Sequence, residues 1–143
     1  MKTMTKLTTL ALTAVFGLAA VVSAQDAPPA PPAKPAATLP PASTKTGVTF
    51  TTDIKPIFDA SCGKCHGDTK PKGGITLTSL EGTLKGGKDG KILTVGDSTK
   101  GSMINAVAHI GNPQSFMPKG PGAKALTPEQ IGLIRAWIDQ GAK

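Results

Sequence analysis

The feature that most constrains this chain is the pentapeptide Cys62-Gly63-Lys64-Cys65-His66, which holds both cysteines and one of the two histidines of the 143-residue sequence. A disulfide between the two thiols would close a very small loop and would contribute little stability. A zinc site needs four ligands, and outside the pentapeptide only His109 is an obvious nitrogen or sulfur donor. A thioredoxin-like dithiol needs a βαβ context, which the sequence does not offer. Another chemistry must therefore occupy the two sulfurs.

The pattern Cys-x-x-Cys-His is the one that attaches haem c. Two thiols at this spacing add across the two vinyl groups of the porphyrin, and the adjoining imidazole then reaches the iron. The sequence therefore predicts one covalently attached haem, with Cys62 and Cys65 as the attachment residues and His66 as an axial iron ligand.

Three residues are candidates for the sixth position on the iron: Met103, His109 and Met117. Met103 falls in the apolar stripe of an expected helix, which favours a role in the core. Met117 stands in a loop before Pro118, and a proline holds the preceding backbone extended. We favour Met117 on spacing and loop context. His109 is the alternative, although its position at a helix end favours an interaction with the helix dipole.

The N-terminal residues resemble a secretory leader. Lys2 and Lys6 precede an apolar run at 7–22, and small residues end at Ala24, where we place the cleavage site. The run is shorter than the roughly 20 residues of a spanning helix, so a retained membrane anchor is the second possibility. The prediction is a signal peptide at 1–24 and a periplasmic protein.

The next segment, 25–46, is rich in proline and alanine and predicts an extended, semi-rigid linker. Ordered structure is expected from about Gly47, which leaves one domain at 47–143. Without Lys2 and Lys6 the net charge is +5, from 14 basic and 9 acidic residues. The lysines are scattered and lack interleaved aromatic residues, which argues against nucleic-acid binding and favours an acidic protein partner.

Local signals predict three helices. The first spans 53–61 with Thr52 as N-cap, the second spans 101–108 after start signals at 97–99, and the last begins at a capping box of Thr127 and Gln130 and ends at Gly141. Short apolar runs at 75–77 and 92–95 are expected to pair as a small β-hairpin around residues 79–84.

From about residue 50 to the C-terminus the sequence resembles the single-haem class I cytochromes c, in particular the short planctomycete-type cytochrome c domain. The resemblance implies an all-α fold in which N- and C-terminal helices cross around the haem, with the loop methionine, here Met117, as distal ligand. Members often have a second proline after that methionine, where this chain has Lys119. The resemblance rests on the pentapeptide and on Ile54-Lys55-Pro56-Ile57-Phe58, Lys72-Gly73-Gly74 with Leu77, Gly86-Gly87, Val95-Gly96-Asp97, Ser102-Met103-Ile104, Met117-Pro118 and the run from Leu133 to Ala142.

These features predict a monomeric, non-enzymatic electron carrier in which the haem forms the centre of the core. Three lysines are expected to frame the exposed haem edge toward an acidic redox partner, and we call them the lysine set: Lys64, Lys72 and Lys119. Two other functions stay open: a haem protein with a labile distal ligand that binds small molecules or reduces peroxide, and a haem subunit of a membrane oxidoreductase that uses the linker as reach.

Overall fold

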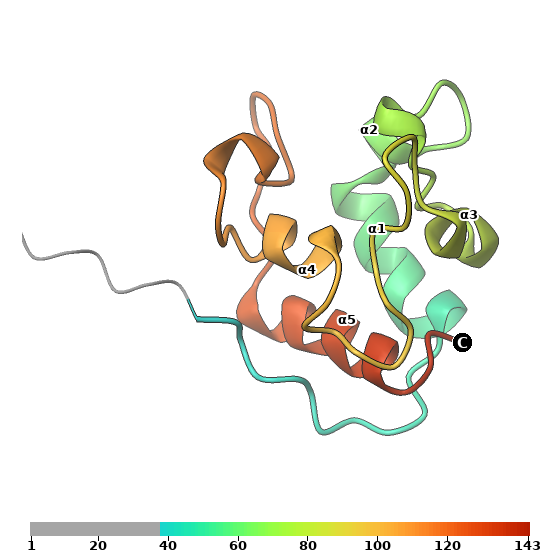
Figure 1. Ribbon diagram of the computed structural model, residues 1–143, viewed down its shortest axis with the longest axis vertical. Coiled ribbons are helices and arrows are strands. Elements are labelled where there is room, and N and C mark those ends of the chain that lie inside the picture. The colour runs from blue at the N-terminus through green and yellow to red at the C-terminus, as the bar shows by residue number, and fades with distance from the viewer. Residues whose placement is uncertain (1–37) are drawn as a thin grey trace, which may run out of the picture. The chain divides into compact units, whose positions relative to one another are not determined.

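Residues 38–143 are described in the computed structural model of Figure 1, and every regular element among them is helical. The expected leader and most of the expected linker lie outside the described residues, so the domain boundaries stay a prediction. The all-α fold class is confirmed. The elements are the π-helical turn η1 (Phe50–Ile54), α1 (Lys55–Ser61), α2 (Gly63–His66), the 3₁₀ turn η2 (Lys72–Gly74), α3 (Leu80–Lys85), α4 (Ser102–Val107), the 3₁₀ turn η3 (Pro113–Ser115) and α5 (Pro128–Asp139).

The first helical segment starts earlier than the sequence predicts. Thr49, not Thr52, is the N-cap, and its hydroxyl accepts the Thr52 N–H at 3.4 Å. In the opposite direction, the Thr49 N–H donates to the Asp53 carboxylate at 2.9 Å. This is a reciprocal cap of the capping-box kind, with the carboxylate one residue later because η1 is a π-turn.

The predicted β-hairpin is wrong. The described residues contain no strand, and their two isolated β-bridges lie within single turns, at Gly87 with Gly90 and at Thr94 with Asp97. The apolar run at 75–77 is bound instead to the turn formed by the pentapeptide 62–66, which we call the haem-motif turn. Leu77 donates its N–H to the His66 carbonyl at 2.8 Å. Residues 79–84, the expected hairpin tip, mostly form α3, which Ser79 caps.

The two later helices are confirmed. α4 begins at Ser102 after Gly101, whereas the start signals at 97–99 belong to a separate turn. In α5 both hydrogen bonds of the Thr127–Gln130 capping box are present. The chain leaves α5 through Gly141 at φ 100, where Gly141 and Ala142 donate to the carbonyls of Ile138 and Trp137. This pair of bonds is a Schellman motif, which explains the glycine.

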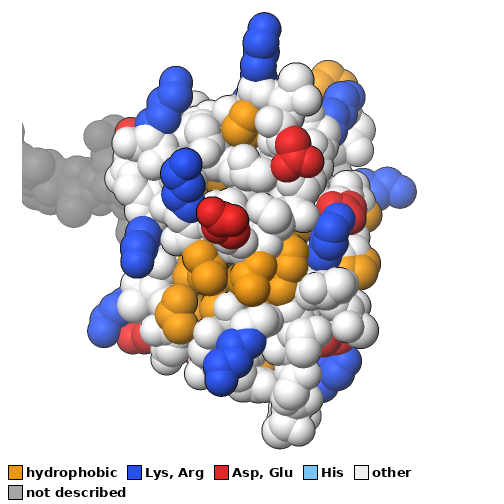
Figure 2. Space-filling model, turned by 90° about the vertical axis from the view of Figure 1, so that its right-hand side faces the viewer, with side chains coloured by type: hydrophobic (Ala, Val, Ile, Leu, Met, Phe, Trp, Pro, Cys, Tyr) orange, Lys and Arg blue, Asp and Glu red, His pale blue; other side chains and the backbone are white. Residues whose placement is uncertain are grey.

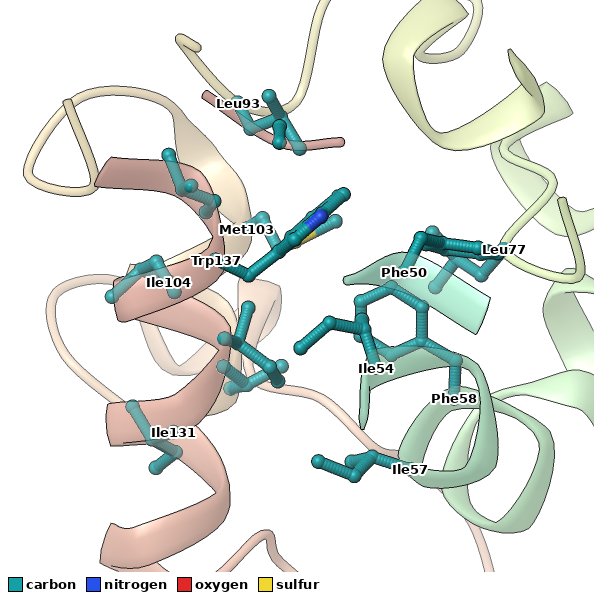
Figure 3. Close-up of a cluster of buried hydrophobic side chains, with 14 of the residues drawn as sticks. Phe50, Ile54, Ile57, Phe58, Leu77, Leu93, Met103, Ile104, Ile131 and Trp137 are labelled. Atoms are coloured by element: carbon teal, nitrogen blue, oxygen red, sulfur yellow. The ribbon is translucent and has the colours of Figure 1, made fainter. Parts of the chain in front are cut away.

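The core joins the N-terminal helical segment to α5. Trp137 is completely buried, and its ring centroid lies 5.8 Å from that of Phe50, which in turn lies 6.2 Å from Phe58 in an edge-to-face arrangement. Figure 3 shows these rings between the two segments, together with Met103 from α4. The Trp137 indole N–H donates to the Lys143 carbonyl at 2.9 Å, which satisfies the buried polar atom.

Residues 38–46 already contact the domain, so ordered structure begins before Gly47. The Ser43 N–H donates to the Gly132 carbonyl at 2.9 Å, and the Arg135 guanidinium donates to the Pro40 carbonyl. A side chain on Gly132 would lie only 2.7 Å from the Pro41 carbonyl oxygen. The glycine in α5 therefore allows this segment to approach the helix backbone closely.

Candidate functional site

The pentapeptide forms a tight helical turn at the end of α1. Cys62 separates α1 from α2 and still donates its N–H to the Phe58 carbonyl at 2.7 Å. The N–H groups of Cys65 and His66 both donate to the Cys62 carbonyl, at 3.0 and 2.9 Å. Backbone hydrogen bonds thus hold both thiols and the imidazole on one turn. Because α2 contains a glycine and only four residues, propensity did not reveal it.

Both cysteines are free and half-buried. Burial raises the pKa of the Cys62 thiol to about 11, and the neighbouring Cys65 adds to the shift. A reactive dithiol depends on the thiolate form, so this environment does not favour one at Cys62. A thioether is neutral and suits the same half-buried position.

The His66 ring is oriented by a backbone carbonyl. Its Nδ1 lies 3.2 Å from the Ile75 oxygen. A carbonyl oxygen only accepts hydrogen bonds, so Nδ1 carries the proton, and in the neutral imidazole Nε2 keeps its lone pair. That tautomer is the one a metal-ligating histidine needs, with the second ring nitrogen fixed by a hydrogen bond.

Met117 lies on a different segment, in the loop that follows α4. Its side chain is partly buried against the core, and its N–H donates to the Ala106 carbonyl at 3.0 Å. Figure 1 shows α2 and η3, which just precedes Met117, on opposite sides of the domain. The structure thus brings Cys62, Cys65 and His66 together, whereas Met117 is presented from a separate element.

The other two candidates for the sixth ligand have different roles. Met103 is 7% exposed and packs in the core, as predicted. His109 was expected to interact with the helix dipole. Its Nε2 instead lies 2.9 Å from the Met117 carbonyl oxygen, and its ring stacks on Phe116. Nε2 must therefore be protonated, and it is occupied as a hydrogen-bond donor.

The donor set fits a c-type haem. Two free thiols stand at the attachment spacing, one imidazole has its Nδ1 bound and its Nε2 lone pair free, and a partly buried thioether is available. Histidine with methionine is a known axial pair for haem iron. The sequence analysis did not identify two contributors, the Ile75 carbonyl and the His109 ring, because contacts with backbone carbonyls leave no pattern of side chains.

Comparison with known families identifies one match. Residues 62–120 match the family model described as Planctomycete cytochrome C. This match supports a planctomycete-type cytochrome c domain in the chain. Such a domain implies a covalently bound haem c and haem-based electron transfer, and cytochrome c domains are typically extracytoplasmic. The matched segment contains the pentapeptide and Met117 but not α1 or α5. No curated protein and no solved structure matches the chain.

Within residues 38–143, no helix has the length and apolar character needed to span a bilayer.

Figure 2 shows the face that bears α3, where apolar side chains reach the surface between charged groups of both signs. Val95 is 52% exposed and lines a shallow hollow with Leu84 and Lys91. None of the predicted haem ligands lines this hollow.

Proposed function

We propose that the domain is a periplasmic, single-haem electron carrier whose haem is attached through Cys62 and Cys65 and ligated by His66 and Met117. The observation that carries the proposal is the arrangement of side chains on the haem-motif turn. Two free thiols share that turn with an imidazole whose Nδ1 is bound to the Ile75 carbonyl. The unbound Nε2 is then available to iron.

Attachment needs no oxidant. Each S–H would add across one vinyl double bond of the haem, so that the sulfur bonds to one vinyl carbon and the hydrogen goes to the other. The products are two thioethers without charge, which suits the half-buried positions of Cys62 and Cys65.

When bound, the haem supplies a reversible one-electron change at its iron. The protein's contribution is to keep both ligands in place. The Ile75 carbonyl restrains the His66 ring, and hydrogen bonds at the backbone of Met117 restrain its loop. Ligands that do not rearrange favour fast electron transfer, and a thioether ligand favours a higher reduction potential than a second imidazole.

We further propose that the partners are redox proteins with an acidic docking face, that the domain acts as a monomer, and that it has no catalytic activity of its own. All three members of the lysine set, Lys64, Lys72 and Lys119, are exposed. Exposed positive charge near an electron-transfer site steers an acidic partner and raises its association rate. This steering weakens as salt screens the charges.

The proposal is tested by the ferric optical spectrum of the purified protein. We expect a low-spin spectrum with the near-infrared band of a thioether–iron bond. Met117→Leu should abolish that band, whereas the matched control Met103→Leu should keep it because Met103 is in the core. A high-spin ferric spectrum in the unmodified protein would support the labile-ligand alternative. Co-purification with a membrane complex would support the oxidoreductase-subunit alternative.

A further inference from the structure

We propose that His109 is a positioning residue that holds the Met117 loop through a hydrogen bond and an aromatic stack. The inference rests on the proposed ligation of iron by Met117. It assigns a function to the second histidine of the chain, which lies 43 positions after His66 and takes no part in haem attachment.

The first support is the hydrogen bonding of Met117. Its N–H donates to the Ala106 carbonyl at 3.0 Å, and its carbonyl accepts from His109 Nε2 at 2.9 Å. Ala106 lies in the last turn of α4, and His109 follows the C-cap residue Ala108. Both backbone polar groups of Met117 are therefore bound to the end of one helix. The buried residues of α4 in turn anchor that helix in the core.

The second support is the stack of His109 on Phe116. The two ring centroids are 4.9 Å apart, and the ring planes differ by 7°. Phe116 directly precedes Met117, so the stack and the hydrogen bond act on neighbouring residues. Stacked rings contribute beyond the area they bury. The imidazole is thus held by one ring face and one nitrogen.

The third support is the backbone of His109, which has φ +55. This left-handed conformation is uncommon for a residue with a side chain and has an energetic cost. The same conformation follows the end of α4 directly and accompanies the contact between the imidazole and the loop at 116–117. The strain is therefore located where the loop is held.

The consequence is a measurable competition at the iron. If His109 holds the loop at 116–117, then removing its contacts should let an added ligand displace Met117 from the iron more easily. Imidazole is a suitable probe for the ferric protein. His109→Phe keeps a flat ring but loses the N–H donor, and we expect about fivefold tighter imidazole binding, the effect of one neutral hydrogen bond. His109→Ala loses the ring as well, and we expect imidazole binding that is at least about tenfold tighter than in the wild type.

A matched control is Lys70→Ala, because Lys70 is exposed and has a similar φ of +50. It should leave the imidazole affinity unchanged. Wild-type affinity in both His109 variants, in protein that shows the thioether band, would overturn the inference and leave the proposed function intact. Absence of that band from the wild-type protein would refute Met117 ligation itself, and the inference with it.

A measurement on the unmodified protein keeps the test decisive if the variants do not mature. Long-range ¹⁵N–¹H NMR of the ferrous holoprotein should show His109 as the Nε2–H tautomer, the form that donates to the Met117 carbonyl. The Nδ1–H tautomer would overturn the inference.

Discussion

Gly87→Ala tests how the fold positions the imidazole of His66. A methyl group on Gly87 would lie 2.6 Å from the Gly73 carbonyl oxygen and 2.5 Å from Cγ1 of Ile75. Both contacts are on the segment whose Ile75 carbonyl binds His66. A hydrogen bond already joins this segment to the residue that follows Gly87, because Lys88 donates its N–H to the Gly73 carbonyl at 2.9 Å. The substitution should therefore push the Ile75 carbonyl away from the imidazole.

The magnitude follows from the two contacts. Overpacking costs typically about 1–3 kcal/mol, and a lost neutral hydrogen bond at His66 adds about 1 kcal/mol. We expect the free energy of unfolding of the holoprotein to fall by about 2–4 kcal/mol. For a domain of roughly 100 residues this lowers the Tm by roughly 10–20 °C. A less basic imidazole should also raise the reduction potential, because the hydrogen bond to Nδ1–H increases ligand basicity.

The assay is thermal unfolding followed by circular dichroism, together with a potentiometric titration. Gly63→Ala is the matched control, since its added methyl group meets only the Phe58 carbonyl oxygen, at an ordinary 3.8 Å. This control should have an unchanged or slightly raised Tm, because alanine is favoured over glycine in a helix. If Gly87→Ala matched the wild type in both Tm and potential, the proposed support of His66 by the 73–75 segment would be refuted.

Three other predictions concern folding, pH and docking. The double variant Cys62→Ala, Cys65→Ala made without haem should be largely unfolded, because the haem is expected to centre the core; a cooperative thermal transition would contradict this. Hydrogen bonds from the Thr99 side chain, then from Lys100, lower the pKa of Asp97 from 3.8 to about 2. The ionised Asp97 carboxylate should therefore stabilise the folded state fully above pH 3.8, and this stabilisation should be lost as the pH falls through about 2. Thr99→Val should move the NMR-titrated pKa upward, and an unchanged value would count against the hydroxyl as the cause. Neutralising the lysine set should flatten the salt dependence of electron exchange with an acidic partner, and an unaltered dependence would place the docking face elsewhere.

Local signals explain what the sequence predicted well. Thr127, Pro128 and Gln130 specify the start of α5 without help from the rest of the chain, and the structure contains all three features. The haem motif is similarly local, because its chemistry depends on the spacing of Cys62, Cys65 and His66. Apolar periodicity also gave α4 and the burial of its methionine.

Contacts to backbone carbonyls and N–H groups of neighbouring segments explain what the sequence did not reveal. The run at 75–77 has the composition of a strand, but its Leu77 N–H binds the His66 carbonyl and its Ile75 carbonyl binds the His66 ring. Likewise, the His109 ring binds a carbonyl eight residues later in the chain. Neither acceptor is visible in a pattern of side chains, so both the false hairpin and the missed contacts have the same cause.

The central claim is that one haem is covalently held at Cys62 and Cys65. The most direct test is the intact mass of the protein, purified from a host with the haem-ligation machinery, together with its visible absorption. We expect a coloured protein whose mass exceeds that of the polypeptide by one haem and stays so after denaturation. A colourless protein with the mass of the bare polypeptide would contradict it.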